Sequence, residues 1–353
     1  MSRPAISIQK SGGWTFGSPS VLMMFYRASG ELQSELTEMD ECMPHYYKIT
    51  NGHGQGAETI MRAEADFMRA CFADAQIMLE RAYAQIDGNG QENMALCCDF
   101  LAWRLSLCTS FTPRESFEQR REALLQQHNV AWLNILQSSC AYYYALLGLP
   151  EKIPAVFREH QLASIHFLAP GKPMMELIEN QVYLAQGEYA KVIGHSEALL
   201  GMCEAMHYAL VALHIRLQTA AAYEMLGKCE TADELLISAL AAAGPDALYL
   251  PFVENYRYLK TALTRGAGAK FAAFVRTVTP LGEDFVRRCG EKRAEGSRPA
   301  ALAGLTEREI AIAALVAKRL SNREIAEQLF LSEGSVKQYI NQIYSKLLIT
   351  GDV

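Results

Sequence analysis

Three helix starts follow one another within the C-terminal segment 305–353, and no other feature restricts the fold as strongly. Thr306 and Glu309 have the spacing of a capping box, in which the hydroxyl accepts from the third backbone N–H of a helix and the carboxylate accepts from the N–H of the cap residue. Ser321 and Glu324 repeat this spacing, and Ser332 is a further good N-cap. The segment therefore predicts helices at about 306–317, 321–329 and 332–347.

Only Phe330 and Leu331 separate the second and third of these helices. A turn that short, with the small Ala326 where the helices cross and Val336 facing it, predicts a helix-turn-helix. The third helix then exposes polar side chains, namely Ser335, Lys337, Gln338, Asn341, Gln342, Ser345 and Lys346. These residue types suit a DNA groove, because Lys can contact guanine acceptors or phosphate while Gln and Asn can pair with adenine. A polar third helix can also contact another protein, and this alternative stays open.

The run LSNREIAEQLFLSEGSVKQYINQIYSKL, at 320–347, resembles the DNA-binding domain of LuxR-type transcription regulators. The resemblance implies that Lys337, Gln338 and Asn341 face bases in the major groove. It places Ser335 and Lys346 towards phosphates, and we count Asn322 among the DNA-binding residues as well.

The segment departs from the family pattern at three points. Arg319 and Leu348 stand where the family usually has Gly. A left-handed helix end, which favours Gly, is unfavourable for a residue such as Arg319. The chain ends at Val353, before the fourth helix through which the family generally pairs two domains on DNA. We expect either a truncated protein or a domain that cannot dimerise through that helix.

A helical period dominates the chain from Ala57 onward, and similar helical hairpins recur with turns at Ala70, Gly187 and Gly227. The first interval, 187 − 70 = 117 residues, is three steps of 39, and the second, 227 − 187, is 40. Further helix breaks at Ser110 and Gly148 fall near the missing steps. The spacing predicts five hairpins of about 40 residues, which form an all-α, tetratricopeptide-like solenoid. The alternative is an irregular all-α bundle.

We divide the chain into four parts. Residues 1–56 are a poorly defined helical segment with short helices at about 20–27 and 31–47. Residues 57–290 form the repeat domain, which ends in a further helix pair broken at Gly266 and Gly268. Residues 291–303 lack periodicity and carry Gly, Ser and Pro, which predicts a flexible linker. Residues 304–353 are the small DNA-binding domain.

The stretches EYAKVIGHSEALL and LYLPFVEN, with the 40-residue spacing, resemble the C-terminal part of the large ATP-dependent LuxR regulators, whose best-known member senses a maltodextrin. The resemblance implies a nucleotide-binding module ahead of the repeats. This chain contains no GxxxxGK[ST] motif, so we predict no ATP site and no cofactor within it.

Nine cysteines, none in a CxxC pair, lie mostly in apolar helical stretches, which is typical of reduced thiols in the cytoplasm. The N-terminus lacks the pattern of a signal peptide, and no segment is predicted to span a membrane. His207 and His214 would lie on one helix face but about 10 Å apart, too far to share an ion. We therefore predict no metal site.

Trp132 and the run Tyr142, Tyr143 and Tyr144 are open to two interpretations. They could pack in the core of one hairpin. Alternatively, some of the rings could line the inner surface of the superhelix and stack on an effector such as a sugar.

These observations predict a DNA-binding transcriptional regulator whose helical repeats sense an effector or a partner protein. Our hypothesis is that occupancy of the repeats shifts them between arrangements that bury or release the DNA-binding domain. The expected partners are double-stranded DNA, a small-molecule or protein effector on the repeats, and RNA polymerase, but no membrane. The alternative is an interaction scaffold with a non-functional DNA-binding tail. No catalytic triplet can be assembled from local motifs, so we do not predict an enzyme.

Overall fold

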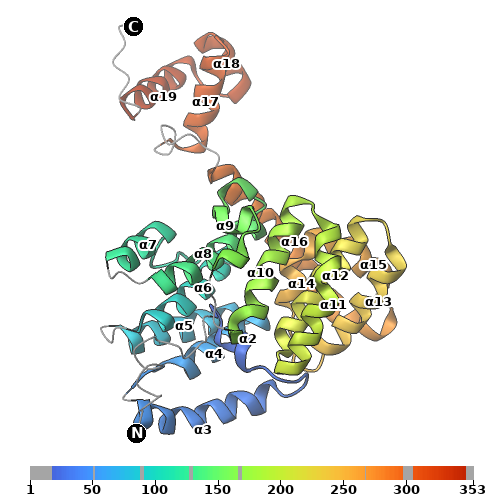
Figure 1. Cartoon of the computed structure of the whole chain (residues 1–353). Helices are drawn as coiled ribbons and strands as arrows, with labels where there is room; N and C mark the ends of the chain where they lie inside the picture. The colour runs from blue at the N-terminus through green and yellow to red at the C-terminus, as the bar shows by residue number, and fades with distance from the viewer. Residues whose placement is uncertain are drawn as a thin grey trace. The chain divides into compact units, whose positions relative to one another are not determined.

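The computed structural model describes residues 18–50, 52–87, 91–126, 130–165, 169–266, 268–296 and 305–346 (Figure 1). All regular structure in these ranges is helical, and they contain no strand. The chain is therefore all-α, as predicted. It divides into two compact units, Met1–Gly290 and Glu291–Val353, which are described separately below.

The first unit begins with α2 (Val21–Phe25) and α3 (Leu32–Thr50), close to the two predicted N-terminal helices. Ser20 caps α2, and its Oγ accepts a hydrogen bond from the N–H of Met23 at 3.2 Å. Helix α2 contacts α4 and α12, and four of its five residues are buried. A segment that we expected to be poorly defined thus contributes to the core.

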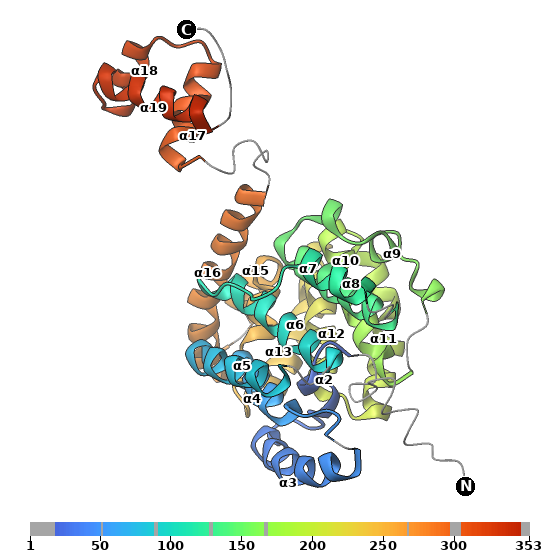
Figure 2. The same ribbon diagram turned by 90° about the vertical axis from the view of Figure 1, so that its left-hand side faces the viewer.

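Three helical hairpins carry the predicted turns. They are α4 (Ala57–Met68) with α5 (Phe72–Ile86), α10 (Lys172–Gln186) with α11 (Tyr189–Met206), and α12 (Ala209–Met225) with α13 (Cys229–Ala243) (Figure 2). Ala70, Gly187 and Gly227 each adopt a left-handed conformation, with φ of 60°, 78° and 72°. The next N–H bonds back to the preceding helix, as from Lys228 to the carbonyl of Tyr223 at 2.9 Å. This is the Schellman arrangement, which satisfies carbonyls that a helix end leaves free.

The middle of the array departs from the five equal hairpins that we predicted. The breaks at Ser110 and Gly148 are present, since α6 (Glu92–Cys108) is followed by α7 (Phe117–Gln126), and α8 (Val130–Leu147) ends before Gly148. In the described residues between Gly148 and α10, which are 149–165 and 169–171, no full helix forms. These residues contain short pieces, namely η2 (Pro150–Lys152), α9 (Ala155–Arg158), η3 (Leu162–Ser164) and η4 (Ala169–Gly171). Pro150, Pro154 and Pro170 lack the N–H that a continuous helix requires, and α8 packs against α10 instead.

The repeats end in α14 (Leu250–Glu254), α15 (Tyr256–Gly266), η5 (Ala269–Phe271) and α16 (Ala272–Gly296). The predicted break near Gly266 and Gly268 separates α15 from α16. Residues 291–296 were predicted as linker, and this was wrong, because they continue α16. Glu, Lys, Arg and Ala are good helix formers, and they dominate these six positions. The remainder of the predicted linker, 297–303, lies outside the described residues.

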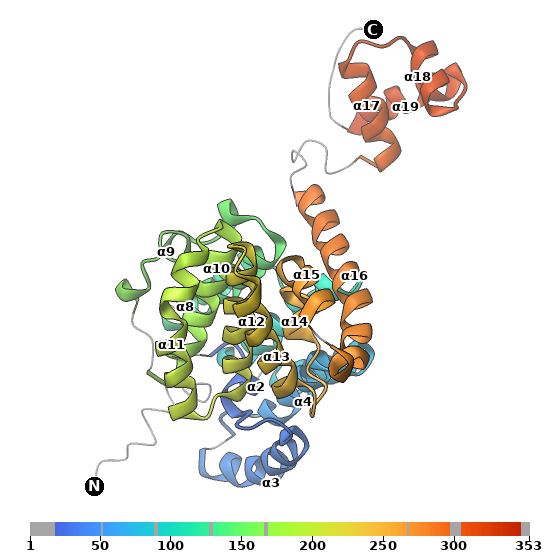
Figure 3. The ribbon, with the colours of Figure 1, turned by 90° about the vertical axis from the view of Figure 1, so that its right-hand side faces the viewer.

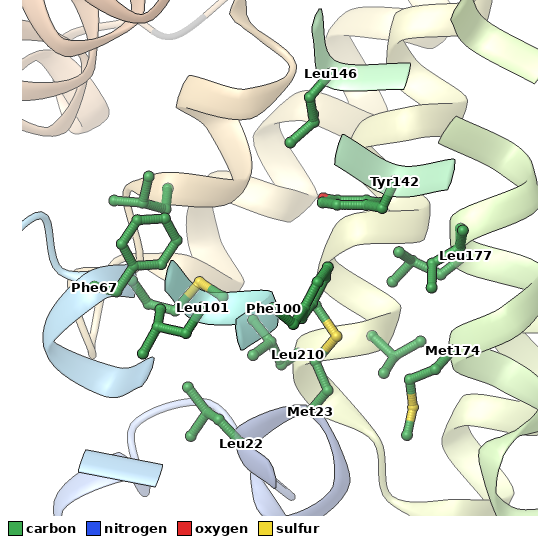
Figure 4. Packing of buried hydrophobic residues seen from close by; sticks show 14 of the residues in the cluster. Leu22, Met23, Phe67, Phe100, Leu101, Tyr142, Leu146, Met174, Leu177 and Leu210 are labelled. Carbon is green, nitrogen blue, oxygen red and sulfur yellow. The ribbon is translucent and has the colours of Figure 1, made fainter. Parts of the chain in front are cut away.

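The core of the first unit joins helices that are far apart in sequence. Figure 4 shows Leu22 of α2, Phe67 of α4, Phe100 of α6 and Tyr142 of α8 within one cluster of apolar side chains. Within the core, Nε of Arg104 donates to Glu254 at 2.8 Å, and both side chains are 1% exposed. Because an unpaired buried charge is costly, this ion pair fixes α6 against α14.

The second unit contains α17 (Glu307–Ala317), α18 (Asn322–Leu329) and α19 (Glu333–Lys346). Its core is small and consists of Leu305, Ile312, Ile325, Ala326, Val336 and Ile343. Both predicted capping boxes are present, at Thr306 with Glu309 and at Ser321 with Glu324. The order α17, α18, α19 therefore reproduces the predicted trihelical segment.

Candidate nucleic-acid interface

The turn between α18 and α19 brings the two helices together in the way that the sequence predicted. Phe330 adopts a left-handed conformation with φ of 52°, and the N–H of Leu331 bonds to the carbonyl of Ala326 at 2.9 Å. Ala326 and Val336 are 5% and 0% exposed and belong to the same apolar cluster. The small side chain of Ala326 permits the close approach, so the pair forms a helix-turn-helix.

Ser332 caps the N-terminus of α19, as predicted. Its Oγ accepts a hydrogen bond from the N–H of Ser335 at 3.1 Å and lies 2.8 Å from the Ser335 hydroxyl. Ser335, predicted to face a phosphate, is half-buried and takes part in this cap. The free N–H groups and positive dipole of a helix N-terminus favour an anion at this end of α19.

One face of α19 is polar and exposed. Its side chains follow the helical spacing and are Lys337, Gln338, Asn341, Gln342 and Ser345. Within the described residues, none of them makes a hydrogen bond or an ion pair. The predicted base-reading residues therefore share one face, and within the described residues their polar groups make no hydrogen bond to the rest of the domain.

Lys346 differs from these residues because its ammonium already has a partner. Nζ donates to Oε2 of Glu309 at 2.8 Å, and this carboxylate also accepts from the N–H of Thr306 at 2.7 Å. The bond from Lys346, together with the one from Thr306, lowers the pKa of Glu309. Sequence reasoning missed this contact, because Lys346 and Glu309 are 37 positions apart and no local pattern links them. Asn322, at the first position of α18, is exposed.

The predicted aromatic effector surface is not formed by Trp132 and Tyr142. Tyr142 is 0% exposed, and its hydroxyl donates to Glu254 at 2.8 Å, while Trp132 is 7% exposed. Neither ring can stack on a ligand, because each is enclosed by the core. Tyr143 and Tyr144 are half-buried, and their ring centroids lie 5.4 and 5.7 Å from that of Phe117. The core-packing interpretation therefore applies to Trp132 and Tyr142, whereas an effector contact by the partly exposed Tyr143 and Tyr144 stays a prediction.

His207 and His214 do not share a helix face, contrary to our expectation. His207 ends α11 in a left-handed conformation with φ of 56°, whereas His214 is buried inside α12. Within the described ranges, no three His, Cys, Asp or Glu side chains converge as metal ligands. No helix in those ranges is long and apolar enough to cross a membrane.

Comparison with known proteins identifies the C-terminal segment. Residues 303–353 match the family described as "Bacterial regulatory proteins, luxR family". Transcriptional regulatory protein LnrK of Bacillus subtilis (strain 168) is 43% identical over 121 residues, which cover 33% of this chain and 53% of that protein. DNA-binding transcriptional activator DevR/DosR of Mycobacterium tuberculosis (strain ATCC 25618 / H37Rv) is 34% identical over 117 residues, which cover 33% of this chain and 50% of that protein.

The chain thus spans about half the length of the curated relatives that it matches. No solved structure matches it. In its C-terminal helix-turn-helix, the chain is similar to the luxR family of bacterial regulatory proteins.

Proposed function

We propose that this chain is a DNA-binding transcriptional regulator, in which the helix-turn-helix binds promoter DNA and the helical repeats sense an effector or a partner protein. The observation that carries the proposal is the exposed face of α19, whose polar side chains are unpaired within the described residues. The luxR-family match over 303–353 supports it, as does the similarity to two relatives that are described as a transcriptional regulatory protein and a DNA-binding transcriptional activator.

Within this proposal, Lys337, Gln338 and Asn341 read base edges in the major groove. Their amide and ammonium groups supply the donors and acceptors that distinguish base pairs there. Ser335, Lys346 and Asn322 contact the sugar-phosphate backbone, which fixes the orientation of the domain on the duplex. Lys346 can do so while it is bonded to Glu309, because an ammonium has three donors.

Charge sets the strength of this binding. Residues 305–353 carry six basic side chains (Arg308, Lys318, Arg319, Arg323, Lys337 and Lys346) and six acidic ones (Glu307, Glu309, Glu324, Glu327, Glu333 and Asp352). A neutral domain gains little from counterion release, which supplies most of the sequence-independent affinity for DNA. A single copy should therefore bind modestly and depend on its base contacts.

The resemblance of the repeats to those of the large ATP-dependent LuxR regulators belongs to the same proposal. Hairpins with turns at Gly187 and Gly227, 40 residues apart, support it. It predicts a phosphate-binding module upstream in the full gene product, which the sequence of the source gene would reveal. RNA polymerase as a partner and the cytoplasm as the location follow from action at a promoter.

Gel-shift titration of a promoter library with the Lys337→Ala variant tests the proposal. Loss of one base contact should weaken binding to the best site about tenfold and relax the base preference at one position. Lys48→Ala, which removes the same charge from an exposed position of α3 in the first unit, is the control and should bind as the wild type does. Unchanged binding by Lys337→Ala would show that α19 does not read the DNA.

A further inference from the structure

A groove of about 940 Å³ lies along α11, α12 and α13 in the first unit. Figure 3 shows these three helices side by side, with α12 packed against both neighbours. The loop that follows α2 reaches one end of the groove, where the N–H of Ala209 donates to the carbonyl of Tyr26 at 3.1 Å and Ser29 Oγ donates to the carbonyl of Ala242 at 2.6 Å. The volume lies within the range of small-molecule sites.

Arg216 of α12 lines this groove and is half-buried. Within the described residues, its guanidinium has no hydrogen bond and no ion pair. Other half-buried arginines do have partners: Arg62 with Asp40, Arg69 with the carbonyl of Asp246, Arg120 with Asp99, Arg257 with the carbonyl of Leu146, and Arg288 with Asp284. A partly desolvated guanidinium favours a planar anion that can accept two parallel hydrogen bonds, as a carboxylate does.

Gly201 of α11 also lines the groove. A glycine inside a helix destabilises the helix relative to alanine, so it is normally kept for a tight contact or for space. No tight contact exists here, because a Cβ added at Gly201 would meet no atom within 4 Å. Glycine at this position keeps the wall of the groove free of a side chain.

The charges of the groove are arranged by depth. Arg216 is half-buried on α12, whereas Glu197 and Glu204 of α11 and Glu234 of α13 are exposed. Arg27, which also lines the groove, is exposed and is already paired with Glu35 and Glu38. Three carboxylates at the rim repel a multiply charged anion such as phosphate or nucleic acid. They attract a ligand that presents a positive group outward while a single carboxylate reaches the guanidinium.

We infer that this groove binds a small zwitterion, an amino acid or a short peptide, with its carboxylate on Arg216 and its ammonium group among Glu197, Glu204 and Glu234. The inference rests on the proposed function in that it names the class of effector that the repeats would sense. Binding to the groove is nevertheless measurable without DNA, so either proposal can fail alone.

Affinity-selection mass spectrometry of the full chain, with a random tripeptide pool, tests the inference. The wild type should enrich peptides with a free C-terminus over the same pool with amidated C-termini. Arg216→Gln should lower this enrichment about tenfold, because a hydrogen-bonded charge pair is lost. Arg216→Lys, which keeps the charge but not the two-pronged geometry, should restore part of it. Equal enrichment of both pools, or of neither, would overturn the inference.

A steric variant separates the groove from other surfaces. Gly201→Leu places a side chain in the open space and should abolish enrichment without loss of helix. Gly194→Leu is the matched control, because Gly194 lies on α11 two turns earlier, has no atom within 4 Å of an added Cβ and does not line the groove. Wild-type enrichment by Gly201→Leu would place the peptide elsewhere. Parallel gel shifts with the same variants report on DNA binding by itself.

Discussion

Arg319 follows the end of α17 in a conformation that glycine adopts more easily. Its φ is 61°, and its N–H donates to the carbonyl of Val316 at 2.8 Å. The N–H of Leu320 donates to the carbonyl of Leu315 at 3.3 Å. The Schellman geometry is therefore complete although its left-handed position holds an L residue with a long side chain. The departure from the family pattern at this position changes the strain of the turn and leaves its hydrogen bonds in place.

Replacing Arg319 with glycine should therefore stabilise the second unit by roughly 1 kcal/mol, because the left-handed conformation costs an L residue about that much. Hydrogen exchange of α17 and α18 amides in the full chain would report the change as slower exchange. Lys318→Gly provides the comparison: Lys318 has φ of −78°, so glycine there relieves no strain and should accelerate exchange. Faster exchange in Arg319→Gly would contradict the assigned strain.

His214 shows how burial at one residue becomes a pH dependence. Neither ring nitrogen has a hydrogen-bond partner within the described residues, and burial, aided by the nearby charge of Arg104, lowers the pKa of His214 to about 3. The unfolded chain binds a proton at His214 below about pH 6.5, whereas the folded protein binds it only below about pH 3. The contribution of His214 to the free energy of unfolding is therefore fully present above about pH 6.5 and is lost as the pH falls from about 6.5 to about 3.

His214→Phe should keep the ring volume and remove this acid sensitivity. We expect the variant to melt at a higher temperature than the wild type, and this difference should grow as the pH falls from 6.5 to 4. Thermal unfolding at several pH values would measure it. His45→Gln, at an exposed position of α3, should leave the pH profile unchanged. A constant difference across the pH range would show that protonation of His214 is not the cause.

At the scale of elements, local signals were predictable and long-range ones were not. Capping pairs such as Thr306 with Glu309 and turn residues such as Gly187 act within a few positions, so the helix-turn-helix and three hairpins could be located from the sequence. The burial of α2 and the pairing of α8 with α10 depend on segments far away along the chain. Tyr142 illustrates the same limit, because its partner Glu254 is 112 positions distant.

The same distinction divides the two lysines of α19. Lys337 has no partner in the described part of the domain, whereas Lys346 is already paired with Glu309. Binding to DNA releases counterions in proportion to the unpaired positive charge that the protein brings among the phosphates, whether its ammonium contacts a base or a phosphate, and one such charge changes the salt slope by about one. Lys346 brings its own counter-charge, Glu309, to the backbone. Lys337→Gln should therefore reduce the slope of affinity against salt more than Lys346→Gln does. Fluorescence anisotropy titrations at several salt concentrations would measure both slopes, and equal reductions would refute this ranking.

At the scale of the whole first unit, Asp246 connects the N-terminal segment to the end of the hairpin that α12 and α13 form. Its Oδ2 accepts from the hydroxyl of Tyr26 at 2.7 Å and from the N–H of Gly30 at 2.6 Å, while Oδ1 accepts from the N–H of Leu32 at 3.3 Å. Asp246 follows α13, whereas its three donors lie in and beside the loop between α2 and α3. One carboxylate thus holds the N-terminal helices against the last clear hairpin.

Asp246→Ala should cost about 3 kcal/mol, because several donors lose a buried acceptor at once. The expected signs are a melting temperature lowered by several degrees and faster proteolysis between α2 and α3. Asp233→Ala is the comparison, since Asp233 pairs with Arg265 near the surface, where an ion pair contributes less than about 1 kcal/mol. A similar drop in melting temperature in the two variants would show that Asp246 does not hold the N-terminal helices in place.

Residues 22–26, which are most of α2 and the residue after it, bond to both α4 and the start of α12. They therefore connect two parts of the helical array that are distant in sequence. The N–H of Leu22 donates to Glu64 at 2.6 Å, and the carbonyl of Tyr26 accepts from Ala209 at 3.1 Å, so five residues bridge hairpins that lie more than a hundred positions apart. Because both contacts are made by the same short segment, a displacement at one of them also acts on the other. A peptide in the groove that displaced the start of α12 would therefore also strain the contacts of α2 with α4.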